Sequence, residues 1–187
     1  MNKSTKKLVL SSLFLALAIV FQFMGKSLPT VSQLFVGPIV NALLLMTLVV
    51  CDIGWGIVVG CLTPILAWSL GQLPAPFGPF IPFIAIGNAI YIVVFYLIAR
   101  DKKKGTYFLS GKESYKGILA VLISAICKFL FLYISASKLI KLLSLPIKPQ
   151  IANKLITAMG LFQLITAILG GILAILVLKL LKKRRQL

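Results

Sequence analysis

Histidine is absent from this chain of 187 residues, and its only acidic residues are Asp52, Asp101 and Glu113. Most general acid–base chemistry uses paired carboxylates or imidazole, and imidazole is also the commonest metal ligand. Because these groups are missing or scarce, the sequence predicts neither catalytic residues nor a metal site. We expect a protein that is not an enzyme and carries no cofactor.

A phosphate-binding loop is also missing. Gly25-Lys26-Ser27 matches the end of the G-x-x-x-x-G-K-[ST] pattern, but Val20 stands where the first glycine is required. The apolar segments contain no carboxylate, which is the usual relay for protons or sodium ions in secondary transporters. If this chain moves a solute uphill, the energy must come from a partner.

Hydrophobic residues are abundant, at 60% of the chain, whereas charged residues make up only 12%. A soluble fold has no interior large enough to bury so much apolar surface. Six apolar segments have roughly the 20 residues needed to cross a bilayer. They cover 8–24, 33–50, 53–71, 81–99, 117–137 and 156–181. The sequence predicts an all-α integral membrane protein, a single domain over residues 1–187 that forms a bundle of six transmembrane helices.

The formal net charge of +17 comes from lysines and arginines that cluster at the ends of the apolar segments. This placement indicates membrane topology and contact with anionic lipids, so nucleic acid is not an expected partner. Most of the basic residues lie within 3–7, 100–116 and 179–185. Since the side richer in lysine and arginine faces the cytoplasm, both termini are predicted to be cytoplasmic in a multi-pass protein of the cell membrane.

Polar side chains inside the apolar segments are few. The clearest are Asn41, Thr63, Asn88, Lys128, Gln163 and Thr166. For any one amide or hydroxyl, an interhelical hydrogen bond is at least as good an interpretation as a ligand contact, whereas several sharing one cavity would favour the ligand contact. Lys128 is different, because an ammonium near the middle of a membrane helix costs about 2.5–3.5 kcal/mol. It needs an anionic ligand, carbonyl partners or water, and a role in a cavity is favoured over snorkelling to the interface.

Two proline-containing connections are predicted to be loops. Residues 72–79 form an outer loop, and a basic connection with Pro146 and Pro149 precedes the last helix. Aromatic side chains surround the first of these loops. They are Trp68, Phe77, Phe80 and Phe83. Taken singly each is typical of an interfacial anchor, but together with Gln72 they can form a lid that stacks on a flat organic solute.

Three short segments and the overall plan point to a known family. The segments are Lys6-Lys7-Leu8-Val9-Leu10-Ser11-Ser12, Gly37-Pro38-Ile39-Val40-Asn41 and Pro82-Phe83-Ile84-Ala85-Ile86-Gly87-Asn88. With its size and six expected helices, the chain resembles the substrate-binding S components of energy-coupling factor (ECF) transporters over nearly its full length. These small membrane proteins capture vitamins and other micronutrients.

The resemblance implies partners and site residues. In that family a pair of small residues on the first helix packs against a transmembrane T component, which two cytoplasmic ATPases drive. Ser12 and Ala16 match the spacing, with serine in place of the family's alanine. The implied substrate-binding residues, including Asn41 of the second segment, are Gln33, Asn41, Gln72, Phe77, Asn88, Lys128 and Gln163.

The scarcity of acidic residues also restricts the substrate. A buried cation such as a divalent metal needs a carboxylate to neutralise it, so a neutral or anionic vitamin or vitamin precursor is expected. The alternative is a structural or assembly subunit of a membrane complex, with packed helices and no solute site. Convergence of Asn88, Lys128 and Gln163 on one cavity favours solute capture over that alternative.

Overall fold

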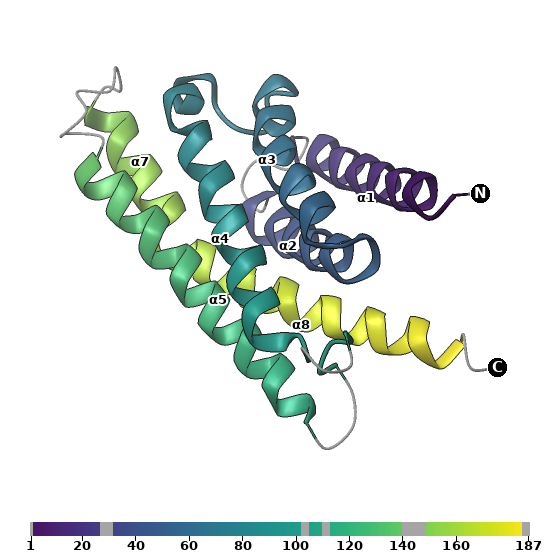
Figure 1. Cartoon of the computed structure of the whole chain (residues 1–187). Helices are drawn as coiled ribbons and strands as arrows, with labels where there is room; N and C mark the ends of the chain where they lie inside the picture. The colour runs from purple at the N-terminus through teal and green to yellow at the C-terminus, as the bar shows by residue number, and fades with distance from the viewer. Residues whose placement is uncertain (1, 27–31, 102–104, 110–112, 140–148, 185–187) are drawn as a thin grey trace.

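A computed structural model describes residues 2–26, 32–101, 105–109, 113–139 and 149–184, without the side chains of Ser32, Gln33, Leu139, Lys183 and Arg184. The expected all-helical fold is confirmed for this part of the chain (Figure 1). The helices are α1 (Lys3–Lys26), α2 (Ser32–Cys51), α3 (Ile53–Ser69), the 3₁₀ helix η1 (Ala75–Phe80), α4 (Ile81–Ala99), α5 (Ser114–Ile134), the π-helical turn η2 (Ser135–Leu139), α7 (Pro149–Met159) and α8 (Leu161–Arg184).

Five helical stretches in the described part of the chain are long and apolar enough to cross a membrane. They are Lys3–Lys26, Leu34–Cys51, Ala75–Ala99, Ser114–Lys138 and Pro149–Lys182. The apolar helix Ile53–Ser69 is shorter, at 17 residues. Large hydrophobic side chains cover the outside of the bundle, such as Leu180 on α8 and Leu97 on α4, which are 64% and 60% exposed. An apolar exterior of this kind fits a multi-pass membrane protein surrounded by lipid.

The centre of the bundle is the contact between α2 and α8, where glycines allow the backbones to approach closely. A Cβ atom on Gly170 would lie 2.5 Å from the carbonyl oxygen of Pro38 in α2. The neighbouring Gly171 faces α5, where a Cβ atom would lie 2.4 Å from Val121 Cγ1. Tyr91 of α4 joins the same core and donates a hydrogen bond from its hydroxyl to Ala167 O of α8 at 2.7 Å. The glycine pair thus places α8 between α2 and α5.

The last membrane segment differs from the single helix expected over 156–181. The structure has two helices, α7 and α8, with a turn at Gly160 between them. Helix α7 begins at Pro149, within the stretch expected to be a loop. Proline is well tolerated in the first turn of a helix, where its missing N–H group would have no partner in any case. Pro149 therefore marks the beginning of a helix, and Pro146 lies outside the described residues.

Helix α3 ends two residues before the expected boundary at residue 71. Gly71 has a φ of 75°, the left-handed conformation in which glycine commonly ends a helix. Gln72 N donates to Ala67 O and Gly71 N to Trp68 O, each at 2.9 Å. This hydrogen-bond pattern closes the helix. The chain then enters η1, so the stretch expected as a loop over 72–79 is largely a short 3₁₀ helix.

The beginning of α1 and the end of α8 lie on the same side of the bundle (Figure 1). On that side Lys7 Nζ of α1 lies 3.1 Å from Asp52 Oδ2, in the one-residue connection between α2 and α3. Asp52 also caps α3, because its Oδ1 accepts a hydrogen bond from Ile53 N at 2.9 Å. These two contacts fix the turn between α2 and α3 against the first helix.

Candidate functional site

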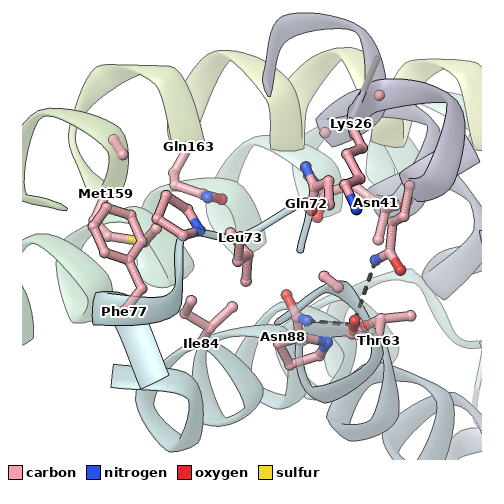
Figure 2. A pocket seen from close by; sticks show the side chains of 18 of the residues that line it. Lys26, Asn41, Thr63, Gln72, Leu73, Phe77, Ile84, Asn88, Met159 and Gln163 are labelled. Carbon is pink, nitrogen blue, oxygen red and sulfur yellow. Dashed lines mark hydrogen bonds between the residues drawn. The ribbon is translucent and has the colours of Figure 1, made fainter. Parts of the chain in front are cut away.

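A cavity of about 500 Å³ lies between the helices, beside the last turns of α1 (Figure 2). Nine polar or charged residues line it, from α1 to α5, α7, α8 and the segment after α3. They are Gln22, Lys26, Asn41, Thr63, Gln72, Asn88, Lys128, Lys154 and Gln163. A volume of this size is typical of small-molecule sites.

Lys128 of α5 lies on the wall of this cavity, and its side chain is buried. Its Nζ donates to Asn41 Oδ1 of α2 at 2.6 Å and to Asn88 Oδ1 of α4 at 2.8 Å. The same nitrogen lies 5.4 Å from the centre of the Tyr91 ring, within range of a cation–π contact. The ammonium is therefore held by carbonyl partners, and no lining residue is a carboxylate.

Asn88 is oriented by a proline in the neighbouring helix. Pro64 has no N–H group, so the carbonyl of Gly60, four residues earlier in α3, receives no helical hydrogen bond from it. Asn88 Nδ2 donates to Gly60 O at 2.8 Å and lies 3.4 Å from Thr63 Oγ1. With its amide nitrogen held there, Asn88 presents its oxygen to Lys128. The proline in α3 thereby positions the amide that binds the ammonium.

Gln22 of α1 is a cavity residue that the sequence analysis missed. It is buried, and its Nε2 donates to Thr63 O at 3.2 Å, whereas its Oε1 has no hydrogen-bond donor among the described residues. An amide within the apolar run 8–24 was the available signal, of the same kind that identified Asn41 and Asn88. A continuous series of hydrogen bonds crosses α1, α3, α4, α5 and α2. It links Gln22, Thr63, Asn88, Lys128 and Asn41 in that order.

Apolar side chains form the other part of the wall. Leu73, Phe77, Ile84 and Met159 line it, and Figure 2 shows Phe77 and Met159 together, away from Asn41 and Thr63. The segment η1 that carries Phe77 is held to α3, because Trp68 Nε1 donates to Ala75 O at 3.1 Å.

Of the four aromatic residues proposed as a lid, only Phe77 lines the cavity. Phe80 is buried and stacks on Phe83 with ring centres 5.1 Å apart, while Trp68 is half exposed beside η1. The four-residue lid is therefore wrong. Phe80 cannot reach a solute because it fills the core between η1, α4 and α5.

The structure brings together six of the seven predicted substrate-binding residues on this one cavity. They are Asn41, Gln72, Phe77, Asn88, Lys128 and Gln163. The side chain of the seventh, Gln33, lies outside the described part of the chain. Thr166 is buried but does not line the cavity; its hydroxyl donates to Gln163 O at 3.2 Å. Within the described residues, no group of three Cys, Asp or Glu side chains is placed to hold a metal ion.

Ser12 and Ala16 lie on the exposed side of α1, whereas Ser11, Phe14 and Ala18 face the bundle.

The model of one protein family, "ECF transporter, substrate-specific component", matches residues 6–182. This chain belongs to the family of ECF transporter substrate-specific components. The predicted resemblance is thereby confirmed. No curated protein and no solved structure matches the chain.

ECF substrate-specific components are membrane-bound transport subunits that bind a small molecule, and they are not enzymes. Membership of the family implies a small-molecule substrate, and a T component with its ATPases as partners. The expectation that the chain is not an enzyme is confirmed. For this ECF component, the cavity between the helices is the candidate place for the substrate.

Proposed function

We propose that this ECF component captures a neutral or anionic vitamin, or a vitamin precursor, from outside the cell. The observation that carries the proposal is the buried ammonium of Lys128 at the wall of a cavity of about 500 Å³, whose hydrogen bonds within the described residues go to the neutral amide oxygens of Asn41 and Asn88. A buried charged side chain is costly in the membrane, and a subunit with a purely structural role does not require one in the wall of a polar cavity. This favours solute capture over a structural or assembly subunit.

The substrate-binding residues in this proposal are those that share the cavity, together with Gln33. The chain crosses the cell membrane six times, with α3 as the shortest crossing and α7 and α8 as one crossing. Both termini then lie in the cytoplasm, beside the basic residues of 100–116 and 179–185. The cavity opens toward the outside in this orientation.

The partner surface in this proposal is the exposed side of α1. Ser12 and Ala16 are small, so they allow the backbone of another helix to approach closely. We assign them to contact with the T component, which two cytoplasmic ATPases drive. The energy for transport comes from those ATPases, since this chain has no phosphate-binding loop of its own.

Mass spectrometry tests the proposal directly. The full chain, purified in mild detergent, is washed and then denatured, and the released small molecules are identified. We expect a vitamin-sized solute in stoichiometric amount, and calorimetry should show that this solute rebinds without ATP. A folded protein that retains no solute, or that binds one only in the presence of nucleotide, would contradict the proposal and favour a structural subunit.

A further inference from the structure

We infer that the solute is an organic acid, with its carboxylate bound by Lys128 and Asn41 and its apolar body against Phe77, Ile84 and Met159. This inference rests on the proposed function and narrows its substrate from neutral or anionic solutes to carboxylates.

The first argument is the charge of the cavity. Lys26, Lys128 and Lys154 line it, and no acidic residue does. Two of the three acids in the chain are paired elsewhere, Asp52 with Lys7 and Glu113 with Lys116. The charge on Lys128 is therefore satisfied by hydrogen bonds but is not neutralised by a counter-ion. In a membrane interior an ion pair with a bound anion removes much of that cost, so binding favours a solute that brings the negative charge.

The second argument is the count of hydrogen-bond donors at the polar end. An ammonium has three N–H groups, and those of Lys128 donate to Asn41 Oδ1 and Asn88 Oδ1. One ammonium hydrogen is left over. Asn41 Nδ2 has no acceptor among the described residues, whereas Asn88 Nδ2 is held by Gly60 O. Among the described residues these two adjacent donors therefore have no acceptor, and a carboxylate has two oxygens that can accept from both.

The third argument is the shape of the cavity. Asn41, Thr63 and Asn88 lie together at one end, while Phe77 and Met159 lie together at the other, with the amide of Gln163 beside them (Figure 2). A solute that fills both ends has a charged head and an apolar body. Lys26 and Lys154 are exposed parts of the wall, where positive charge attracts an anion before it enters.

The test uses the full chain, incubated with yeast extract as a source of vitamin-sized acids and neutral solutes, then washed and analysed by mass spectrometry. Carboxylates are identified by derivatisation. The wild type should retain a carboxylate. The amount retained by Lys128→Met should be lower by roughly tenfold or more, as expected when a buried charge-assisted contact is lost. The matched control is Lys116→Met, the same substitution at the other end of α5 and outside the cavity, which should behave as the wild type.

A second variant keeps the test decisive if Lys128→Met does not fold. Asn41→Asp places a carboxylate beside the Lys128 ammonium, at the position where the amide oxygen of Asn41 accepts a hydrogen bond in the wild type. It should fold and should lower retention of the acid by roughly tenfold or more, because the built-in carboxylate repels a second one. Undiminished retention by folded Asn41→Asp would overturn the inference.

A retained solute without an acidic group would also overturn this inference, while leaving solute capture intact. Retention of no solute at all by the folded wild type would count against both this inference and the proposed function.

Discussion

Asn88 has two tasks at once, one in the packing of α3 and α4 and one at the cavity. Its Nδ2 replaces the helical hydrogen bond that Pro64 cannot give to Gly60 O, and its Oδ1 binds Lys128. A single amide therefore contacts a buried carbonyl, which also accepts from Thr63 Oγ1 at 3.1 Å, and a buried ammonium, which also donates to Asn41 Oδ1. Removing it leaves both without that partner, which is more costly than the loss of an ordinary hydrogen bond.

We predict that Asn88→Ala lowers the free energy of unfolding by about 1–3 kcal/mol. In a Pro64→Ala background the loss should be smaller, because the alanine that replaces the proline has an N–H group that can donate to Gly60 O. A double-mutant cycle measured by unfolding in detergent checks this coupling. Equal losses in the two backgrounds would show that Pro64 does not determine the role of Asn88.

The carboxyl group of Asp52 gives a prediction of pH dependence. The hydrogen bond from Ile53 N lowers the pKa of this carboxyl below its ordinary value, and the Lys7 ammonium lowers it further. Ionised Asp52 therefore stabilises the folded protein fully above the unfolded-state pKa of about 3.9. This stabilisation is lost as the pH falls through the lower folded-state pKa.

Asp52→Asn tests this effect, because asparagine keeps the helix cap and loses the ion pair. At pH 7 the variant should be less stable by at most about 1 kcal/mol, the range of exposed ion pairs. Thermal unfolding of both proteins from about pH 7 down to about pH 3 should show the difference shrinking as Asp52 becomes protonated. A constant difference over that range would assign the effect to something other than the carboxylate.

The side chains that line the cavity were partly predictable from the sequence. Asn41, Asn88 and Lys128 stand out because each interrupts an apolar run. Their pairing was not predictable, since Lys128 lies 87 positions from Asn41 and 40 from Asn88, and no local pattern specifies a contact over that distance. Lys154 was assigned to topology alone, because a lysine near a segment end is the ordinary signal of a membrane boundary.

Helix α8 packs closely against its neighbour α2. A Cβ atom at Gly170 would meet Pro38 O at 2.5 Å and Asn41 Cβ at 2.6 Å. The first of these is a backbone atom, which cannot move without shifting α2. Because Asn41 is beside the same contact, the separation of α2 and α8 also determines where its amide lies in the cavity.

We predict that Gly170→Ala destabilises the protein by about 1–3 kcal/mol through overpacking. Gly54→Ala is the matched control, because a Cβ atom there meets nothing within 4 Å, and it should be neutral or stabilising by up to about 1 kcal/mol. Unfolding of the two variants in the same detergent measures the contrast. Equal stabilities would mean that α2 and α8 do not pack as closely as described.

The helices themselves were more predictable than the turns between them. A run of apolar residues long enough to cross a bilayer is a strong pattern, whereas a proline indicates either a loop or the first turn of a helix. Pro149 shows the second case, and Pro76 and Pro79 lie within the 3₁₀ helix η1. Which role a proline has depends on packing against distant helices, as when Phe77 and Phe80 of η1 are buried.

For the whole molecule, the first helix has an inner and an outer face. We predict that Ala16→Trp prevents assembly with the T component and its ATPases while leaving affinity for the solute nearly unchanged. Ala16 is exposed on the outer face and does not line the cavity, whereas Gln22 and Lys26 of the same helix do. The control is Leu169→Trp, which adds the same ring at an exposed position of α8 and should assemble normally.

Co-purification of the complex and a solute titration measure the two effects separately. Loss of solute binding with intact assembly would contradict the assignment of Ala16 to the partner surface.

Helix α1 is one uninterrupted helix of 24 residues, roughly 36 Å long. Its last turns form part of the cavity wall, and Ser12 and Ala16 lie near its middle, on the outer face. A straight rod cannot move at one end alone. Any tilt that widens the cavity beside Gln22 must swing the opposite end of the rod against whatever holds it there. If the T component binds this outer face as proposed, a movement of α1 can change the shape of the cavity although the T component does not contact the solute.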